Sequence, residues 1–324
     1  MAIPVLDLST FLSQASNPSV TIIDARSEGE YGHAHIPGAV NIPLMNNSER
    51  TIVGTVYKQK GRDEAIKTGF ELIGPKFFQI IAEAEQKASS KTVLLYCWRG
   101  GMRSNILAWV LGTYGFNVSL LKGGYKSFRN YVIHVNSQPR KMIVLGGPTC
   151  SGKTEILHQI GIKGEQIIDL EGLAHHKGSA FGGLGLPPQP SNEQFENTLA
   201  WELMKSDPEK WLWIENESRT IGSCHLPETI FTTIRNSPLI DIELSKQERV
   251  KRVKTEYAQF PIETLIEKTE KIKKRLGPQH LKAAVMCLQE GDINGWIEIV
   301  MHYYDKLYGY GNSLRNAKIG RAHV

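Results

Sequence analysis

Residues 141–154 read Lys-Met-Ile-Val-Leu-Gly-Gly-Pro-Thr-Cys-Ser-Gly-Lys-Thr, an apolar run followed directly by a glycine-rich loop. Positions 147–154 match the phosphate-binding pattern G-x-x-x-x-G-K-[ST] at every fixed position. The pattern requires a strand before the loop and a helix after it, and the apolar residues 142–145 predict that strand. We therefore predict a P-loop α/β domain that holds a phosphate group at this turn.

The residue types in this loop indicate how it would bind phosphate. Glycine lets the backbone amides wrap an anion, Lys153 adds a point charge, and the Thr154 hydroxyl can reach a metal ion. The predicted phosphate-binding residues are Gly147, Cys150, Ser151, Gly152, Lys153 and Thr154. For Cys150 the sequence leaves two roles open, a small filler of the loop and a thiol made reactive by nearby cations.

An acid at the end of an apolar strand commonly completes such a site by holding Mg²⁺. The run 211–215 ends in Glu215, which is the first candidate, and Glu217 and Asp169 are the alternatives. We expect no tightly bound cofactor and no metal held by a protein cluster, while Mg²⁺ is admissible beside the phosphate. The motif predicts a bound phosphate or diphosphate and does not by itself predict ATP hydrolysis.

A second glycine-rich loop, residues 97–104 (Cys-Trp-Arg-Gly-Gly-Met-Arg-Ser), follows the apolar run 92–96. Cys97 is the predicted catalytic residue, because backbone amides and nearby cations favour the thiolate, the nucleophilic form of cysteine. The predicted anion loop around it comprises Trp98, Arg99, Gly100, Gly101, Met102, Arg103 and Ser104. The spacing C-x5-R also fits cysteine phosphatases, so hydrolysis of a phosphate ester competes with other cysteine chemistry here.

Residues 23–43, Ile-Asp-Ala-Arg-Ser-Glu-Gly-Glu-Tyr-Gly-His-Ala-His-Ile-Pro-Gly-Ala-Val-Asn-Ile-Pro, resemble the signature of rhodanese (sulfurtransferase) domains, whose active loop begins with a cysteine placed like Cys97. The resemblance implies a cysteine that carries sulfur or selenium as a persulfide-type adduct. It favours this chemistry over the phosphatase, as does the absence of a histidine before Cys97. We expect Asp24, Arg26 and His35 to stabilise the fold by satisfying backbone groups at strand ends.

The length of 324 residues allows two domains, each with a full core. Alternating apolar runs and helical stretches predict a rhodanese-like α/β domain over residues 1–135. Polar residues and a proline at 136–140 predict a linker that opens a P-loop NTPase-like α/β domain over 136–245. We expect a helical basic region over 246–317. Residues 318–324 match the translation of a common sequencing adapter, so we expect a non-native tail there and a truncated helical region.

The composition is that of a water-soluble protein, with 41% hydrophobic and 22% charged residues and no apolar run of membrane-spanning length. The first residues lack the features of a secretory signal, so we expect a cytoplasmic protein. The four cysteines are far apart, which indicates neither a disulfide framework nor a zinc site.

The formal charge of +5 is concentrated in one segment, since residues 246–282 contain eleven Lys and Arg against five Glu. Such a surface suits a polyanion, because neutralising phosphates releases counterions, although interleaved acids and bases also describe a solvated helix face. The candidate RNA contacts are Lys251, Arg252, Lys273, Lys274 and Arg275. Trp98 or Tyr125 could stack on an unpaired base, and packing within its own loop is the alternative for Trp98.

The order of the two domains, together with the stretches 169–182, 194–197 and 213–222, resembles the tRNA 2-selenouridine synthase family over essentially the whole chain. The resemblance implies a transferase that replaces the 2-thio sulfur of a modified wobble uridine by selenium. It implies selenophosphate as donor and an S-geranylated intermediate formed from geranyl diphosphate. Cys97 would handle selenium, and the P-loop would hold the diphosphate. Asn216 stands where we expect an acid, which leaves Glu215 and Glu217 as the carriers of that charge.

The same resemblance implies the anticodon loop of tRNA and small-molecule phosphates as partners, with no membrane, and it names no protein partner. Two other interpretations stay open. One is a sulfurtransferase or cysteine phosphatase fused to a nucleotide-dependent kinase. The other is a regulatory module in which the first domain senses sulfur species and the P-loop domain responds to nucleotide. Neither accounts for the family-like stretches outside the two loops.

Overall fold

The computed structural model describes residues 3–313, 315 and 319–323. The chain divides into two compact units, Met1–His134 and Val135–Val324, and the boundary falls inside helix α7 (Gly124–Asn136). The helix therefore includes Asn136, the first residue of the expected linker. None of the helices in the described part of the chain combines the length and apolar character needed to span a bilayer.

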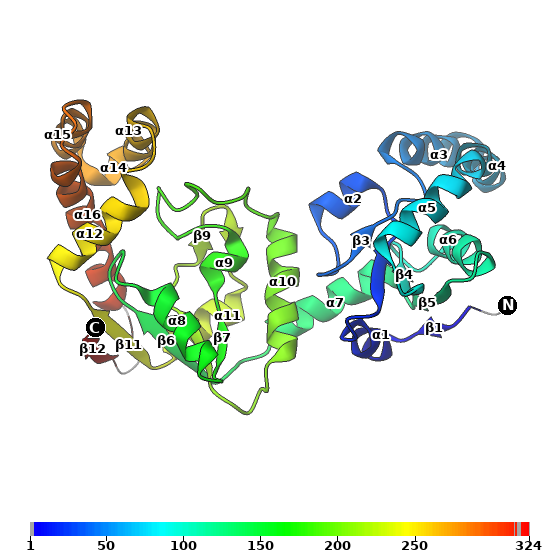
Figure 1. The fold of residues 1–324 in the computed structure, drawn as a ribbon, viewed down its shortest axis with the longest axis horizontal. Coiled ribbons are helices and arrows are strands. Elements are labelled where there is room, and N and C mark those ends of the chain that lie inside the picture. Colours follow the sequence, from blue (N-terminus) through cyan, green and yellow to red (C-terminus); the bar gives the residue numbers. More distant parts are fainter. Residues whose placement is uncertain (1–2, 314, 316–318, 324) are drawn as a thin grey trace. The chain divides into compact units, whose positions relative to one another are not determined.

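The first unit is built on a parallel sheet with the strand order β1-β5-β4-β2-β3 (Figure 1). Its strands are β1 (Val5–Leu6), β2 (Thr21–Asp24), β3 (Val40–Asn41), β4 (Thr92–Tyr96) and β5 (Asn117–Leu121). The central strands β2 and β4 are buried at nearly every position, as expected of a parallel sheet covered on both faces. Both strands end at this unit's functional segments, β4 directly before Cys97 and β2 at Asp24.

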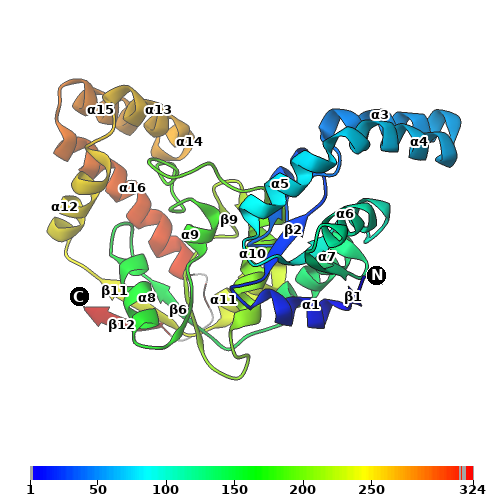
Figure 2. The same cartoon turned by 45° about the vertical axis from the view of Figure 1, so that its right-hand side comes forward.

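Helices complete the first unit. They are α1 (Leu8–Ala15), α2 (Glu28–His33), α3 (Asn47–Lys60), α4 (Arg62–Ile73), the short 3-10 helix η1 (Gly74–Lys76), α5 (Phe77–Lys87), α6 (Met102–Thr113) and most of α7. Helix α6 packs Leu107 and Leu111 into the core of the sheet, where both side chains are fully buried. Helices α3 and α4 form a hairpin and lie side by side in both ribbon views (Figures 1 and 2). Helix α3 buries none of its side chains.

The second unit has a parallel sheet with the order β12-β11-β6-β8-β7. The strands are β6 (Met142–Gly146), β7 (Gln166–Ile168), β8 (Leu212–Glu215), β11 (Leu239–Glu243) and β12 (Ile319–His323), with a separate antiparallel pair, β9 (Thr220–Ile221) and β10 (Cys224–His225). Strand β8 is the direct neighbour of β6. The acid that ends β8 therefore lies beside the loop that follows β6, because parallel strands end at the same edge of a sheet.

The helices of this unit fall into two groups. The first group is associated with the sheet. It comprises α8 (Lys153–Ile162), α9 (Leu170–Ala174), α10 (Asn192–Lys205) and α11 (Glu228–Asn236). The C-terminal group comprises α12 (Lys246–Tyr257), α13 (Ile262–Lys271), α14 (Lys273–Leu276), α15 (Pro278–Gln289) and α16 (Ile293–Ser313). It has its own apolar core around Trp296, whose indole Nε1 donates a hydrogen bond to the Thr269 hydroxyl at 3.0 Å.

The sequence predicted the fold class correctly, since two α/β units and a helical C-terminal region are present. The apolar runs 92–96, 142–145 and 211–215 all form strands, with ends that differ by one residue at most. Of the expected tail at 318–324, residues 319–323 form the edge strand β12, while 318 and 324 lie outside the described residues. Residues 314, 316 and 317 of the expected helical region also lie outside them.

Candidate active sites

Cys97 lies at the end of β4 in a cradle formed by its own loop. The side chain is 3% exposed, and its Sγ accepts a hydrogen bond from the Gly101 amide at 3.3 Å. The Ser104 hydroxyl lies 3.2 Å from the same sulfur and also hydrogen-bonds to the Gly101 carbonyl at 3.0 Å. One backbone amide therefore donates to the sulfur and one hydroxyl lies in contact with it, an arrangement that favours a thiolate.

Close packing against the start of α7 holds this cradle in shape. The carbonyl oxygens of Cys97 and Trp98 accept hydrogen bonds from the Tyr125 and Lys126 amides at 2.8 and 3.0 Å. Gly124, at φ +59°, leaves so little room that a Cβ there would lie 2.2 Å from the Cys97 carbonyl oxygen. The loop geometry thus depends on a glycine outside the motif that identified it.

The expected contribution of the two loop arginines needs correction. Arg103 does not present a free charge to the sulfur, because its guanidinium donates to the Glu30 carboxylate at 2.6 Å. Burial acts to raise the pKa of Glu30, but the hydrogen bond and the charge of Arg103 lower it below its usual value. Arg99 is exposed. The charge of Arg103 is therefore largely neutralised by its ion pair with Glu30. Arg99 and the backbone amides remain to bind an anion.

Asp24 and Arg26 serve the fold, as expected. Their side chains are almost completely buried and form a bidentate ion pair, with a shortest N–O distance of 2.6 Å. Arg26 also donates to the Ala34 carbonyl at 2.6 Å and lies 4.0 Å from the centroid of the Tyr125 ring. Tyr125 is fully buried, so it cannot stack on an RNA base as proposed. Trp98, which is 39% exposed, keeps both of its candidate roles.

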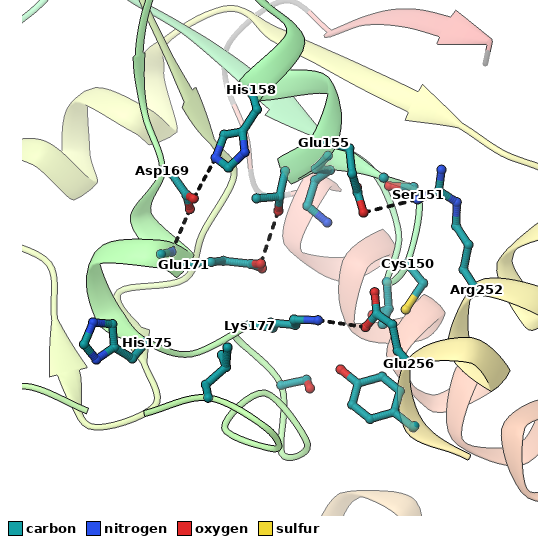
Figure 3. Close-up of a pocket in the computed structure, with 18 of the residues that line it drawn as sticks. Cys150, Ser151, Glu155, His158, Asp169, Glu171, His175, Lys177, Arg252 and Glu256 are labelled. Carbon is teal, nitrogen blue, oxygen red and sulfur yellow. Dashed lines mark hydrogen bonds and ion pairs between the residues drawn. The ribbon is translucent and has the colours of Figure 1, made fainter. Parts of the chain in front are cut away.

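The P-loop of the second unit lines a cavity of about 350 Å³, shown in Figure 3. Five of the six predicted phosphate-binding residues line it, and Gly147 is absent from its walls. Glu171 of α9 lines one side of the cavity, and Arg252 and Glu256 of α12 line the other (Figure 3). A cavity of this size accommodates a small phosphorylated molecule.

Lys153 is the first residue of α8, and its side chain is buried in this unit. Its Nζ donates to the Gly147 carbonyl at 3.1 Å and lies 5.1 Å from the centroid of the Tyr308 ring on α16. Burial acts to lower the pKa of the lysine, but Tyr308, Glu217 and Glu171 raise it above its usual value. The ammonium is therefore charged at neutral pH and held close to the loop that would wrap the phosphate.

Three glutamates gather next to Lys153. The Thr154 hydroxyl lies 2.7 Å from Glu215 Oε1 and 3.3 Å from Glu171 Oε2, while Glu215 Oε2 accepts from the Glu171 amide at 3.3 Å. Glu217 is 7% exposed and hydrogen-bonds to Glu171. Burial, strengthened by the neighbouring carboxylates, raises the pKa of Glu171 to about 8 and those of Glu215 and Glu217 to about 7. The cluster therefore retains protons at neutral pH.

The predicted acids differ in what they contact. Glu215, at the end of β8, is hydrogen-bonded to the P-loop threonine, as expected of the first candidate. Asp169 is instead the N-cap of α9, where it accepts from the Gly172 amide at 2.7 Å and lies 2.9 Å from His158 Nε2 (Figure 3). It lines the cavity, but its oxygens already have local partners. Asp169 is therefore the weakest of the three acids as a metal ligand.

The surroundings of Cys150 disfavour its thiolate form. Burial, strengthened by Glu256, raises the pKa of its thiol to about 12, although Lys153 and Lys177 act in the opposite direction. The residue adopts a left-handed backbone at φ +60°, a conformation that non-glycine residues rarely adopt. Of the two roles left open by the sequence, the structure supports the small loop filler.

The basic C-terminal region is divided between structural and exposed cations. Arg249 is buried, donates to the Thr149 carbonyl at 3.0 Å and pairs with Asp305, so it ties α12 and α16 to the P-loop. Arg252 lines the phosphate cavity and lies 3.5 Å from Glu155. The remaining candidate RNA contacts are exposed on α12 and α14. They are Lys251, Lys273, Lys274 and Arg275.

Two residues of this site were missed at the sequence level. Glu171 stands two positions after Asp169 and enters the cavity because Asp169 caps the short helix α9. A second acid close to the end of a strand is a sequence signal from which Glu171 could have been predicted. Tyr308 lies more than 150 positions after Lys153 in the sequence, and only the packing of α16 brings them together. No local pattern marks such a contact.

In the described part of the chain, no three His, Cys, Asp or Glu side chains are grouped as a metal cluster. Mg²⁺, however, is usually held by only one or two carboxylates together with substrate phosphates. The paired oxygens of Thr154 and Glu215 fit that mode of binding. If Mg²⁺ binds, these two residues would be its protein ligands, with Glu215 in its ionised form.

Comparisons with known proteins match both units. A model of rhodanese-like domains matches residues 7–131, and one described as the tRNA 2-selenouridine synthase AAA domain matches residues 140–322. The tRNA 2-selenouridine synthase of Hydrogenovibrio crunogenus is 37% identical over 335 residues, covering 93% of this chain and 91% of its own. That of Nitrosomonas europaea is 37% identical over 284 residues, covering 84% of this chain and 71% of its own.

One similar solved structure is the N-terminal domain of a putative ATP/GTP binding protein from Clostridium difficile 630. It is 40% identical and covers 40% of this chain and 98% of its own, with a TM-score of 0.37.

Proposed function

Because this chain belongs to the tRNA 2-selenouridine synthase family, we propose that it replaces the 2-thio sulfur of a modified wobble uridine in tRNA by selenium. The observation that carries the proposal is the presence of two different anion sites in one chain. A cysteine cradle suits a small selenium-bearing anion, and a P-loop cavity suits a diphosphate. A single activity that consumes selenophosphate and geranyl diphosphate uses both.

The first step of the proposed reaction is geranylation of the thiocarbonyl sulfur. The sulfur attacks the first carbon of the geranyl group, and the bond between that carbon and the diphosphate oxygen breaks. Lys153, the loop amides and the Thr154 hydroxyl stabilise the charge that builds on the departing diphosphate. Mg²⁺ bound by Thr154 and Glu215 would neutralise part of that charge. Geranylation turns the sulfur into a leaving group and makes carbon 2 an electrophile.

The second step delivers selenium to carbon 2. A selenosulfide on Cys97 would need an oxidant, because selenophosphate carries selenium at the same reduced level as hydrogen selenide. A redox-neutral path avoids that requirement. The Cys97 thiolate attacks phosphorus and expels hydrogen selenide, which attacks carbon 2 and displaces geranylthiolate. Water then cleaves the phosphorus–sulfur bond, which restores the thiolate and releases phosphate. The amides around Cys97 would bind the phosphate oxygens during this exchange.

A Cys97→Ser variant tests the selenium step. With a pre-geranylated anticodon-loop RNA and selenophosphate, we expect the variant to lose at least about 100-fold in the rate of selenouridine formation, since a serine hydroxyl is a far weaker nucleophile at neutral pH. Geranylation of 2-thiouridine RNA by the same variant should continue. A normal rate of selenation would show that Cys97 does not react.

A Lys153→Ala variant tests the diphosphate step in the same preparation. We expect it to impair geranylation by about 100-fold or more, while binding of the anticodon-loop RNA changes little. Equal losses in both measurements would assign Lys153 to RNA binding or to the fold.

A further inference from the structure

A second cavity, of about 230 Å³, opens in the first unit beneath the α3–α4 hairpin. Its floor is formed by the buried side chains of Leu44, Ala65 and Ile73. Helices α3, α4 and α6 supply most of the walls, which are apolar except where Arg62 and Arg103 line them. A cavity without polar partners does not hold ordered water well and favours an apolar ligand.

Exposed apolar side chains collect at the rim of this cavity. Tyr57 on α3 is 58% exposed, Phe70 on α4 is 50% exposed and Met102 on α6 is 46% exposed. Single exposed apolar residues are common, but several around one apolar cavity mark a ligand site. The hairpin carries two of them, and both ribbon views show it as a distinct arm of the unit (Figures 1 and 2).

The cavity shares a wall with the reactive-cysteine loop. Met102 and Arg103 line it, and Ser104, the next residue, has its hydroxyl 3.2 Å from Cys97 Sγ. The first turn of α6 therefore faces the apolar cavity on one side and the sulfur cradle on the other. A ligand bound to the cradle through a polar group can extend an apolar group into the cavity.

The size of the cavity indicates how long that group is. An apolar protein cavity of about 150 Å³ binds benzene, which has six carbon atoms. By proportion, 230 Å³ accommodates roughly nine or ten carbon atoms. A prenyl chain of two isoprene units has ten.

We propose that this cavity binds the geranyl group of the S-geranylated wobble base while selenium is delivered at Cys97. The inference rests on the proposed function, because it takes the geranylated base as the substrate of the cysteine loop. The bond between carbon 2 and sulfur breaks beside the cradle, so the chain attached to that sulfur must lie nearby. The cavity gives the chain an apolar site next to the reacting atoms, and the displaced geranylthiol departs from it.

Direct binding of nucleosides to the full chain tests this proposal without any catalytic turnover. The probes are S-geranyl-2-thiouridine and S-methyl-2-thiouridine, titrated by calorimetry. Each buried methylene contributes roughly fourfold in affinity. We expect the geranyl nucleoside to bind at least about 100-fold more tightly than the methyl one, even if the chain is only partly buried.

A substitution that fills the cavity provides a second, independent test. Gly69 lies on α4 in the cavity wall, and a Cβ there meets no atom within 4 Å, so Gly69→Leu should fold normally and occupy the space. We expect this substitution to lower the affinity for the geranyl nucleoside by about 10-fold or more and to leave the affinity for the methyl nucleoside unchanged. The matched control is Gly54→Leu on α3, which is also helical, has no atom within 4 Å and does not line the cavity.

The outcomes separate this inference from the proposed function. Equal affinity for the two nucleosides, or equal effects of the two substitutions, overturns the inference even if the enzyme makes selenouridine. If Gly69→Leu weakens binding of the geranyl nucleoside and Gly54→Leu does not, the result supports the inference, even if the P-loop unit transfers no geranyl group. If wild type is a dimer by sedimentation and Gly69→Leu alone makes it monomeric, a second copy of the chain covers the cavity and the inference is wrong.

Discussion

Replacing Glu171 by glutamine should change how the P-loop cavity responds to pH. Glu171 is part of a buried cluster with Glu215 and Glu217, and burial together with the Glu217 charge raises its pKa to about 8. A carboxyl with that pKa is about 10% ionised at pH 7 and about 90% ionised at pH 9. In wild type the cavity therefore gains a negative charge across this range, next to the site of a bound diphosphate.

The magnitude follows from linkage between proton and ligand binding. If diphosphate binds only when Glu171 is protonated, the affinity follows the protonated fraction, which falls about tenfold from pH 7 to pH 9. The Glu171→Gln side chain is neutral at both pH values. The ratio of variant to wild-type affinity should therefore be close to one at about pH 7 and about ten at pH 9.

Calorimetric titration with inorganic diphosphate, in the absence of divalent cations, measures this ratio. Taking the ratio cancels the titration of the ligand itself. The control is Glu155→Gln, because Glu155 lines the same cavity but is exposed, and its effect should be the same at both pH values. A Glu171→Gln ratio that does not change with pH would refute the proposed link between protonation of the cluster and diphosphate binding.

Three further predictions concern the framework of the two sites. Gly124→Ala should destabilise the first unit by about 2–4 kcal/mol in urea unfolding, since its Cβ would overlap the carbonyl of the reactive cysteine at a left-handed φ. Gly101→Ala, with no atom within 4 Å, should cost less than about 1 kcal/mol. Arg249→Met should destabilise the second unit by about 1–2 kcal/mol in thermal unfolding, because it removes the hydrogen bond to the P-loop and an ion pair whose Asp305 side is 39% exposed. Replacing Lys273 and Lys274 by alanine should reduce the salt dependence of RNA binding by about one unit of slope per lysine, without changing diphosphate affinity.

Local sequence was sufficient where one short segment determines both the backbone and the chemistry. The P-loop pattern and the Cys97 loop each follow an apolar run, and both lie at strand ends as predicted. Glu215 could be chosen because it ends a strand, and the direct pairing of β6 with β8 then brings it to Thr154. These features depend on neighbours in sequence or on a single strand pairing.

The sequence was insufficient where a side chain meets a partner far along the chain. Arg103 was expected to support the thiolate, but Glu30, more than 70 positions earlier, takes its charge. Tyr125 was expected to be available to a base, but Arg26 and the core enclose it. Arg249 was counted with the basic surface, but in the structure it pairs with Asp305 and donates a hydrogen bond to the Thr149 carbonyl. Tertiary packing decides each case, and no local pattern encodes it.

These partnerships bear on how a tRNA enzyme can bind small anions selectively. An RNA backbone carries many phosphates and would compete for any exposed cationic loop. In the cysteine loop the charge of Arg103 is neutralised by Glu30, and the Gly101 amide and the Ser104 hydroxyl contact the sulfur. In the P-loop the Lys153 side chain is 7% exposed and lies beside Tyr308 and the carboxyl cluster, so little of it is presented at the surface. The exposed cations Lys273, Lys274 and Arg275 are on α14, outside the cavity. Arg99 in the cysteine loop and Arg252 at the P-loop cavity are exposed cations of the two sites. Placing further exposed cations on α14, outside the P-loop cavity, favours binding of RNA and of small anions at different surfaces.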